Sequence, residues 1–337
     1  MPQLRKDPIM SRWVIISTDR KQRPSAFKAE PQKTQPAHLC PFCPGNEAHT
    51  PPEIVAYRDE ATKANDPGWH TRVIPNRIPV LTIEGQLERR GWGMYDMITG
   101  VGAHEIIIET SRHDVDLPDL PPVNIERLIW AYRDRSLDLS HDPRFRYVLI
   151  LRNRGAAAGS TISHPHSELI ATPIVPKRVE EELDGAILYY EYKERCIFCD
   201  IIRQELVERK RVVAENRNFL SFEPFASRFP FETWLIPKFH SCSFPMIQED
   251  QVTDLAYCMK ETFVRLREVL GDRPYNYVLH TAPIPIKAAD QYHWHIEILP
   301  KLARVAGFEW GSGFYINSML PEDAAELLRI AEVDTPA

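Results

Sequence analysis

Cysteines and histidines recur in the same order in the two halves of this chain. Each half has a Cys-x-x-Cys pair, then a lone histidine, and then a His-x-His-x-Glu segment. Two thiolates with two imidazoles form a ligand set that suits tetrahedral Zn²⁺. Because one order of motifs occurs twice, it indicates two metal sites; unrelated buried thiols and core histidines are the alternative. The first set is Cys40, Cys43, His113, His164 and His166, and the second is Cys196, Cys199, His240, His293 and His295.

The first His-x-His-x-Glu segment places three chemically active side chains two residues apart. In a β-strand, residues i, i+2 and i+4 lie on one face, so His164, His166 and Glu168 should point the same way. One imidazole can then bind a metal while the next faces a substrate. Pro165 has no backbone N–H to donate, so we expect this segment at a sheet edge or a strand end, open to a ligand.

Small residues precede this segment at positions 153–161, which read Asn-Arg-Gly-Ala-Ala-Ala-Gly-Ser-Thr. Glycine lets the backbone approach an anion closely, and Ser160 and Thr161 add hydroxyl donors. Such a loop alone is more often a simple turn, but its place directly before paired histidines indicates a phosphate-binding loop. Arg20 and Arg23 carry guanidinium groups suited to bidentate phosphate contacts. Without the rest of the site, a solvated charged segment is the simpler explanation for them.

Composition limits the class of protein. At 337 residues the chain can bury a large core, as two domains or as one domain built from two repeats. A formal net charge of -6 argues against bulk nucleic-acid binding and against DNA-binding zinc ribbons. The N-terminus lacks an apolar signal-peptide stretch, and no later apolar run is long enough to span a bilayer. We therefore expect a cytoplasmic protein with no nucleic-acid or membrane partner, whose cysteines stay reduced.

Periodicity of apolar residues separates strands from helices along the chain. Segments rich in β-branched and aromatic residues, bounded by turn residues, predict strands at 13–17, 105–109, 146–151 and 234–236. Apolar residues on one helical face predict helices at 123–140 and 248–270. Each half then contains a strand, a histidine, a helix, a strand and a His-x-His strand. This order favours an α+β fold with a mostly antiparallel sheet.

Taken together, these motifs resemble the galactose-1-phosphate uridylyltransferases and the related nucleotide-sugar phosphorylases of the histidine-triad superfamily. The resemblance covers nearly the whole chain. It implies a duplicated half-barrel with flanking helices, with one repeat at residues 1–178 and the other at 179–337, and a homodimer. It also implies a ping-pong reaction through a nucleotidyl-histidine intermediate. The matching segments are residues 5–8, Trp13, Arg20, Arg23, and residues 40–46, 72–76, 155–168 and 307–309.

Carried over position by position, the resemblance makes His166 the nucleophile and Glu309 a sugar-hydroxyl contact. His295 is not expected to attack phosphorus, because residues 280–285 lack the glycines that precede His166. Four protein ligands leave no open position for Lewis-acid work, so both zinc ions should be structural. The implied nucleotide and phosphate contacts are Arg20, Arg23, Asn76, Asn153, Gly159, Ser160 and Thr161. The implied zinc ligands are Cys40, Cys43, His113 and His164, and then Cys196, Cys199, His240 and His293, with His295 as the alternative to His293.

One position departs from the family, which usually has glutamine where this chain has Glu168. The glutamine amide donates a hydrogen bond to a phosphoryl oxygen of the intermediate. An ionised Glu168 cannot donate and would repel that oxygen, unless burial keeps it protonated. If Glu168 faces the phosphoryl group and is protonated, activity should fall as pH rises through the pKa of Glu168. An ionised form predicts that Glu168→Gln raises the rate of transfer.

Three functions are consistent with these residues. The first is transfer of UMP between UDP-glucose and a hexose 1-phosphate such as galactose 1-phosphate. The second keeps the His166 chemistry but uses inorganic phosphate as acceptor, as in a nucleotide-sugar phosphorylase acting on ADP-glucose. The third is a zinc-stabilised nucleotide-binding module with little catalysis, which Glu168 alone motivates. The residues that choose base and sugar are dispersed along the chain, so the sequence leaves both open.

Overall fold

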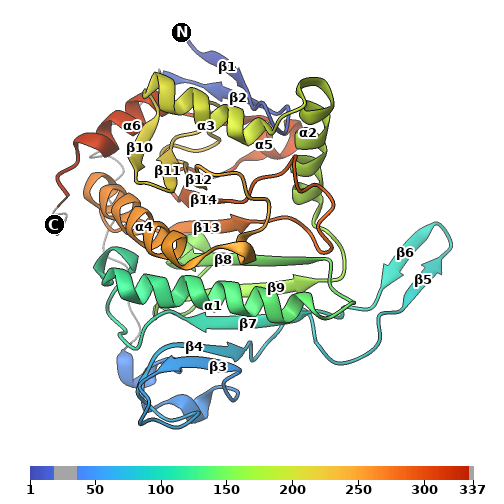
Figure 1. The fold of residues 1–337 in the computed structure, drawn as a ribbon, viewed down its shortest axis with the longest axis vertical. Coiled ribbons are helices and arrows are strands. Elements are labelled where there is room, and N and C mark those ends of the chain that lie inside the picture. Colours follow the sequence, from blue (N-terminus) through green and yellow to red (C-terminus); the bar gives the residue numbers. More distant parts are fainter. Residues whose placement is uncertain (19–35, 334–337) are drawn as a thin grey trace.

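A ten-stranded antiparallel sheet forms the centre of the computed structural model, which describes residues 1–18 and 36–333 (Figure 1). Five of its strands come from each half of the chain, and the halves join where β8 pairs with β13. In sheet order the strands are β10 (Val212–Glu215), β11 (Phe219–Phe222), β12 (Thr233–Pro237), β14 (His295–Pro300), β13 (Tyr275–His280), β8 (Tyr147–Arg154), β9 (His166–Thr172), β7 (Ala103–Ile108), β4 (Trp69–Pro75) and β3 (Val55–Arg58).

Two long helices, α1 (Pro122–Ser140) and α4 (Glu249–Leu270), pack against each other across one face of this sheet (Figure 1). Their buried residues recur every three or four positions, so one stripe of each helix contacts the strands. Pro122 suits the first turn of α1, where its missing N–H has no intrahelical partner. Gly271 ends α4 with a φ of 73°. The helices expected at 123–140 and 248–270 are confirmed.

Alternate side chains of the second-half strands enter two different hydrophobic cores. Phe219 and Leu235 pack in the larger core beneath α4, whereas Leu220, Trp234 and Ile236 belong to the core on the opposite face. That second core is completed by α2 (Lys177–Lys193) and α3 (Ile197–Glu208). Helices therefore cover both faces of this half of the sheet.

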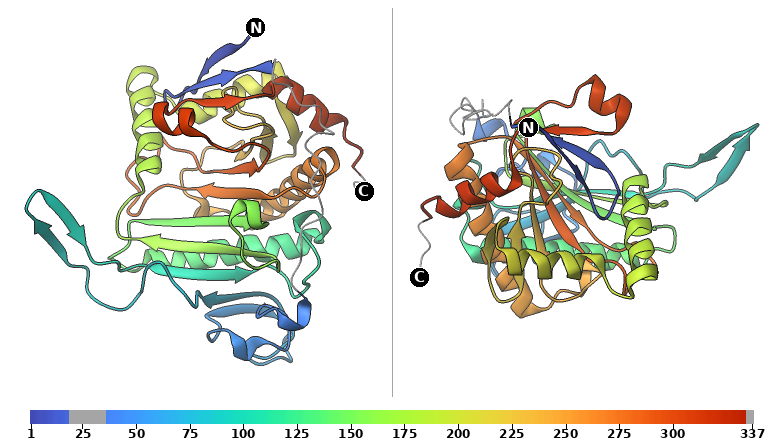
Figure 2. Two further views of the ribbon diagram at one scale, coloured as in Figure 1. Left: turned by 180° about the vertical axis from the view of Figure 1, so that it is seen from behind. Right: turned by 90° about the horizontal axis from the view of Figure 1, so that it is seen from above.

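The first half of the sheet has α-helices on one face only, as far as the chain is described. Leu169 and Ala171 of β9 point into the core beneath α1. Successive strand residues face opposite sides, so His166 and Glu168 lie on the other face. The left view of Figure 2 shows that face, where no long helix of the described residues lies over β7, β8 and β9. The paired histidines of the first half thus lie on the accessible side of the sheet.

Smaller elements surround this framework. The strands β1 (Gln3–Lys6), β2 (Trp13–Ile16) and β15 (Tyr315–Asn317) form a three-stranded sheet, and the hairpin of β5 (Arg89–Trp92) and β6 (Tyr95–Ile98) extends away from the body (Figures 1 and 2). The remaining helices are α5 (Gly307–Ser312), α6 (Pro321–Ile330), and the 3-10 helices η3 (Ala37–Leu39), η4 (Glu47–His49), η5 (Leu117–Asp119), η6 (Ala156–Ala158) and η7 (Phe244–Met246).

The expected fold class is confirmed. The four predicted strands correspond to β2, β7, β8 and β12, and the central sheet is antiparallel throughout. The expected boundary between residues 178 and 179 falls within α2, and the two halves share one sheet, so the division into two domains stays a prediction. Among the described residues, no helix combines the length and the apolar character needed to cross a bilayer.

Because Leu169 of β9 is fully buried, its replacement measures how much the core beneath α1 contributes to stability. Leu169→Ala should lower the free energy of unfolding by about 2–5 kcal/mol, because it removes buried methyl groups and leaves a cavity beneath α1. Urea denaturation measures the change. Leu188→Ala is the matched control, since Leu188 is 52% exposed on α2. Equal losses in the two variants would contradict this account of the core.

Candidate active site and metal centres

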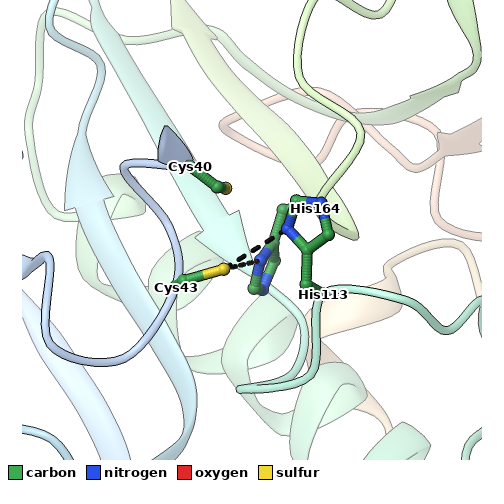
Figure 3. Close-up of side chains that lie close together, drawn as sticks. All are labelled: Cys40, Cys43, His113 and His164. Carbon is green, nitrogen blue, oxygen red and sulfur yellow. Dashed lines mark hydrogen bonds between the residues drawn. The ribbon is translucent and has the colours of Figure 1, made fainter. Parts of the chain in front are cut away.

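The first Cys-x-x-Cys pair and two histidines converge at the start of β9 (Figure 3). Cys43 Sγ lies 3.3 Å from His113 Nδ1 and 3.5 Å from His164 Nδ1, and the ligand atoms of all four residues, including Cys40, lie within 4.8 Å of one another. His164 Nε2 lies 2.7 Å from the Thr110 carbonyl oxygen, so Nε2–H donates there and Nδ1 is left free to bind a metal.

The second set converges in the same way at the start of β14. Cys199 Sγ lies 3.4 Å from His240 Nδ1 and 3.7 Å from His293 Nδ1, and Cys196 completes the cluster within the same 4.8 Å limit. His293 Nε2 donates to the Pro237 carbonyl oxygen over 2.9 Å, as His164 does to Thr110. Each cluster offers two thiols and two imidazole nitrogens, a donor set that fits a tetrahedral metal ion.

His295 lies outside the second cysteine cluster and belongs to a third group. With Glu182 and His280 it forms a cluster in which one ligand atom of each residue lies within 4.8 Å of the others. Glu182, on α2, approaches His280 Nδ1 at 3.1 Å and His295 Nε2 at 3.4 Å. Trp234 stacks on the His295 ring with a centroid distance of 4.6 Å. The geometry therefore selects His293 over His295 for the cysteine cluster, and it buries His295 completely beneath α2.

His166 by contrast borders a cavity of about 600 Å³, within the range of small-molecule sites. Its Nδ1–H donates to the His164 carbonyl oxygen over 2.7 Å, which leaves the lone pair on Nε2. Burial lowers the pKa of His166 and so keeps the ring neutral. A neutral imidazole with a free Nε2 is a competent nucleophile towards phosphorus.

The small-residue loop lines the same cavity. Gly155 and Gly159 have φ values of 81° and 96°, a region that side chains with a Cβ rarely adopt, and they flank the short helix η6. Ser160 and Thr161 line the cavity as expected. The Ser160 hydroxyl donates to the Ile162 carbonyl oxygen over 2.8 Å, so it holds the loop closed as well as facing the cavity. The backbone N–H groups of Gly159 and Ser160 donate to the Ala156 and Gly155 carbonyl oxygens over 3.0 and 3.2 Å. The donors of this loop therefore mainly fix its shape, and the cradle of free N–H groups expected from the sequence is not formed at these two residues.

A buried ion-pair group lies behind the loop. Arg152 is 2% exposed and contacts Glu109 at 3.0 Å and Asp116 at 2.8 Å, while Arg154 contacts Asp116 at 2.7 Å. Burial raises the pKa of Glu109, and Arg152 opposes that rise. For Asp116 burial acts in the same direction, but the two guanidinium groups outweigh it and the pKa falls below its usual range. The guanidinium of Arg152 is thus held at the cavity wall by two carboxylates.

Glu168 is engaged by two neighbouring side chains. His104 Nε2 lies 2.9 Å from Glu168 Oε2, and Asn153 Nδ2 donates to Oε1 over 3.1 Å. The His104 hydrogen bond, opposed by burial, lowers the pKa of Glu168 below its usual range. The structure therefore favours the ionised form, and a loss of activity at rising pH through an elevated Glu168 pKa is not expected. Asn76 Nδ2 lies 3.0 Å from His104 Nε2, so Asn76 belongs to the same neighbourhood.

Other expected contacts do not meet at this cavity. Glu309 lies on α5, beside the N-terminal sheet and away from β9 (Figure 2), and its carboxylate accepts from the Ala306 backbone N–H over 3.1 Å. Arg20 and Arg23 lie outside the described residues. Arg152 was not predicted as part of the site, although an arginine that directly follows five apolar residues of one strand was a usable signal for a buried ion pair.

Family models match both halves of the chain. Residues 1–176 match the model described as galactose-1-phosphate uridyl transferase, N-terminal domain, and residues 182–334 match the C-terminal domain of that family. The ADP-glucose phosphorylase of Arabidopsis thaliana is 38% identical over 334 residues, which are 97% of this chain and 92% of that protein. A galactose-1-phosphate uridylyltransferase of Thermotoga maritima is 30% identical over 345 residues, covering 99% of this chain and 100% of that protein.

A solved structure is also similar throughout. The crystal structure of an ADP-glucose phosphorylase from Arabidopsis thaliana with bound ADP-glucose aligns with a TM-score of 0.83 and 34% sequence identity. The alignment covers 99% of this chain and 100% of that chain. The similarity therefore extends over nearly the whole chain.

The buried ion-pair group generates a stability prediction. Arg152→Met should lower the free energy of unfolding by about 3–5 kcal/mol, because it leaves Glu109 and Asp116 buried without their shared cation. Arg90→Met is the control, since Arg90 forms an ion pair with Glu88 in which both side chains are more than half exposed. Urea denaturation of the two variants measures the difference, and a loss below about 1 kcal/mol for Arg152→Met would contradict the structural role.

Proposed function

Because the chain belongs to the galactose-1-phosphate uridyl transferase family, we propose that it transfers a nucleoside monophosphate through a covalent intermediate on His166. The observation that carries the proposal is the position of this imidazole. Its Nδ1–H donates to the His164 carbonyl oxygen, which directs Nε2 away from that bond, and the ring borders the cavity that the glycine loop also lines. Burial lowers the pKa of His166, which favours the neutral ring. His295 occupies the equivalent place in the second half, where Glu182 and Trp234 enclose it.

The reaction consists of two displacements at one phosphorus. His166 Nε2 attacks the α-phosphorus of a nucleotide sugar, the P–N bond forms, and the sugar 1-phosphate leaves with the oxygen and electron pair of the broken P–O bond. A phosphate oxygen of the acceptor then attacks the same phosphorus, the P–N bond breaks, and neutral His166 is regenerated. The Asn153 amide and the Thr161 hydroxyl, which both line the cavity, stabilise the charge on the phosphoryl oxygens, while Gly159 and Ser160 hold the loop in shape through their own hydrogen bonds.

Two acceptors are candidates. Hexose 1-phosphate would make the protein a uridylyltransferase that moves UMP between UDP-glucose and galactose 1-phosphate, as the family description and the Thermotoga relative suggest. Inorganic phosphate would make it a phosphorylase of ADP-glucose. The higher identity to the Arabidopsis ADP-glucose phosphorylase, 38% against 30%, favours the second candidate.

The proposal includes one structural zinc ion at each cysteine cluster. Cys40, Cys43, His113 and His164 would hold the first, and Cys196, Cys199, His240 and His293 would hold the second. When bound, each ion crosslinks segments far apart in the sequence and fixes the start of a sheet strand. Because the four protein donors of each set fill a tetrahedron, neither ion has an open position for substrate.

The proposal also includes a cytoplasmic homodimer. The cytoplasm keeps thiols reduced, which suits the six free cysteines. Glu309 is assigned to the sugar, yet α5 lies away from the His166 cavity of its own chain (Figure 2). A second copy would supply Glu309 to that cavity, and Arg20 and Arg23 are assigned to the phosphates of the same site.

Labelling of His166 tests the proposed chemistry. A nucleotide sugar labelled at the α-phosphorus should transfer its label to the protein, and peptide mapping should locate it on His166. His166→Gly should abolish labelling, because the attacking atom is gone. His141→Gly, a change at the exposed C-cap of α1, is the control and should label normally. Label that persists in His166→Gly, or that maps to His295, would rule out the assignment.

A chase identifies the acceptor in the same preparation. Labelled protein made with ADP-glucose or UDP-glucose is mixed with inorganic phosphate or with galactose 1-phosphate. Release of labelled ADP by phosphate supports the phosphorylase, and release of labelled UDP-galactose supports the uridylyltransferase. Nucleotide binding without any labelling would point to the third function, a binding module.

Metal analysis tests the proposed zinc sites. The purified protein should contain about two zinc ions per chain, and chelation should destabilise the fold, because structural zinc binding is coupled to folding. Cys40→Ser should lower the zinc content towards one ion and lower the melting temperature. Cys258→Ser, at a buried thiol outside the clusters, should leave the zinc content unchanged. One ion or none in intact wild-type protein would disprove the two-site prediction.

A further inference from the structure

The two carboxylate oxygens of Glu168 both accept hydrogen bonds within the protein. One accepts from Asn153 Nδ2 over 3.1 Å, and the other lies 2.9 Å from His104 Nε2. The backbone N–H of Val80 donates to His104 Nδ1 over 3.2 Å, and this contact together with the Glu168 carboxylate places the ring proton on Nε2. Asn76 Nδ2 lies 3.0 Å from the same nitrogen, so in this tautomer Glu168, and not Asn76, is the partner of the ring N–H. In the described part of the chain, the residues lining the cavity include Asn153 and His166 but neither Glu168 nor His104. Glu168 thus lies on the cavity side of β9, but both of its carboxylate oxygens are directed at neighbouring side chains.

The amide of Asn153 is fixed from its other side by a residue of the second half. Asn276 lies opposite Asn153 across the β8–β13 pairing. Its Nδ2 donates to Asn153 Oδ1 over 2.6 Å and to the Ala158 carbonyl oxygen over 2.9 Å. Because Oδ1 accepts from Asn276, Asn153 must present its NH₂ group to Glu168. One line of hydrogen bonds thus connects His104, Glu168, Asn153, Asn276 and the glycine loop.

An NH₂ group has two hydrogens, and Glu168 takes only one of them. The other remains for a ligand, since Asn153 lines the cavity beside His166. We propose that Glu168, His104 and Asn276 are positioning residues that aim the free N–H of Asn153 at the transferred phosphoryl group. The inference rests on the proposed function, which it deepens by naming what orients the phosphoryl donor. Asn153 touches the substrate, and the other three act through it.

This arrangement explains how a carboxylate is accommodated at position 168. A glutamine there has one acceptor oxygen and one donor NH₂ group. Its NH₂ would face either the His104 Nε2–H or the Asn153 NH₂, which places two donors against each other. A carboxylate satisfies both donors at once. The geometry therefore reverses the expectation drawn from the family: Glu168→Gln should slow transfer and not accelerate it.

Two variants test the line of hydrogen bonds by exchanging a donor for an acceptor or the reverse, with the rate of His166 labelling as the readout. Glu168→Gln places a donor against Asn153, and Asn276→Asp places an acceptor against its Oδ1. Each change turns or loosens the Asn153 amide, and each should slow labelling by about a hundredfold, the usual effect of losing one donor to a developing phosphoryl charge. The KM for the nucleotide sugar should change far less than kcat. Glu126→Gln on α1 is the matched control and should label at the wild-type rate.

The double variant separates positioning from mere stability. In Glu168→Gln with Asn276→Asp, the Asn153 amide can turn over, so that its NH₂ group donates to the new carboxylate and its Oδ1 accepts from the new amide. Both hydrogen bonds of Asn153 are then restored in reverse, although the Ala158 carbonyl oxygen still lacks the donor that Asn276 provides. The double variant should therefore regain part of the melting temperature that Asn276→Asp alone loses. Its labelling rate should stay about a hundredfold below wild type, because the free N–H now points elsewhere. A purely structural role predicts that stability and rate return together, and that result overturns the inference.

Conservative replacement of His104 gives an independent readout. His104→Gln keeps an amide N–H that can donate to Glu168 and should retain the labelling rate within about threefold. His104→Leu removes the donor and should slow labelling by about tenfold or more, the range for losing an oriented hydrogen bond. Equal rates for the two variants overturn the role of His104.

Different results would disprove the positioning role and the proposed function. Wild-type protein that takes no label on His166 disproves the proposed function, and this inference falls with it. Wild-type protein that labels normally, together with Glu168→Gln that labels as fast or faster, disproves the positioning line alone.

Discussion

The alternation of side chains along β9 is the constraint on which the candidate site depends. Leu169 and Ala171 are buried beneath α1, and successive residues of a strand face opposite sides, so His166 and Glu168 must face the cavity side. Pairing with β7 and with β8 sets the register from both edges of the strand. A slip of one residue would turn His166 into the core and turn Leu169 out of it, so the hydrophobic effect and the backbone hydrogen bonds together fix the direction of these side chains.

The second histidine of each His-x-His pair has different surroundings in the two halves, because a helix covers that face of the sheet in one half only. Both second histidines bond the backbone of the first through Nδ1, over 2.7 Å at His166 and 3.1 Å at His295. In the second half, however, α2 brings Glu182 against His295 and Trp234 stacks on its ring. The first half has no α-helix over the equivalent place within the described residues, and a cavity opens there instead. Duplication thus yields one accessible imidazole and one enclosed one.

The halves are also not independent. The β8–β13 pairing makes the sheet continuous, and Asn276 from the second half bonds both Asn153 and the glycine loop of the first. Each cysteine cluster lies at the start of one of the His-x-His strands, and in each the first histidine of that pair donates through Nε2 to a backbone carbonyl oxygen. The second half therefore helps to hold the side chains that line the cavity of the first.

The sequence by itself determined the features that depend on local periodicity and on repeated motifs. Apolar spacing predicted α1 and α4, and the repeated order of cysteines and histidines predicted which residues would cluster. The glycine-rich spacing before His166 predicted the loop that lines the cavity. These succeed because helix period, strand period and ligand spacing are properties of short segments.

Only the tertiary structure decided the partners of each side chain across strands. In the structure, His293 and not His295 lies beside the second cysteine pair, and His295 is enclosed beneath α2. Glu168 contacts His104 and Asn153. Residues 104 and 168, or 153 and 276, are far apart in the sequence and meet because of sheet order and register. No local pattern encodes which strands become neighbours, so the charge state and direction of Glu168 followed from the fold alone.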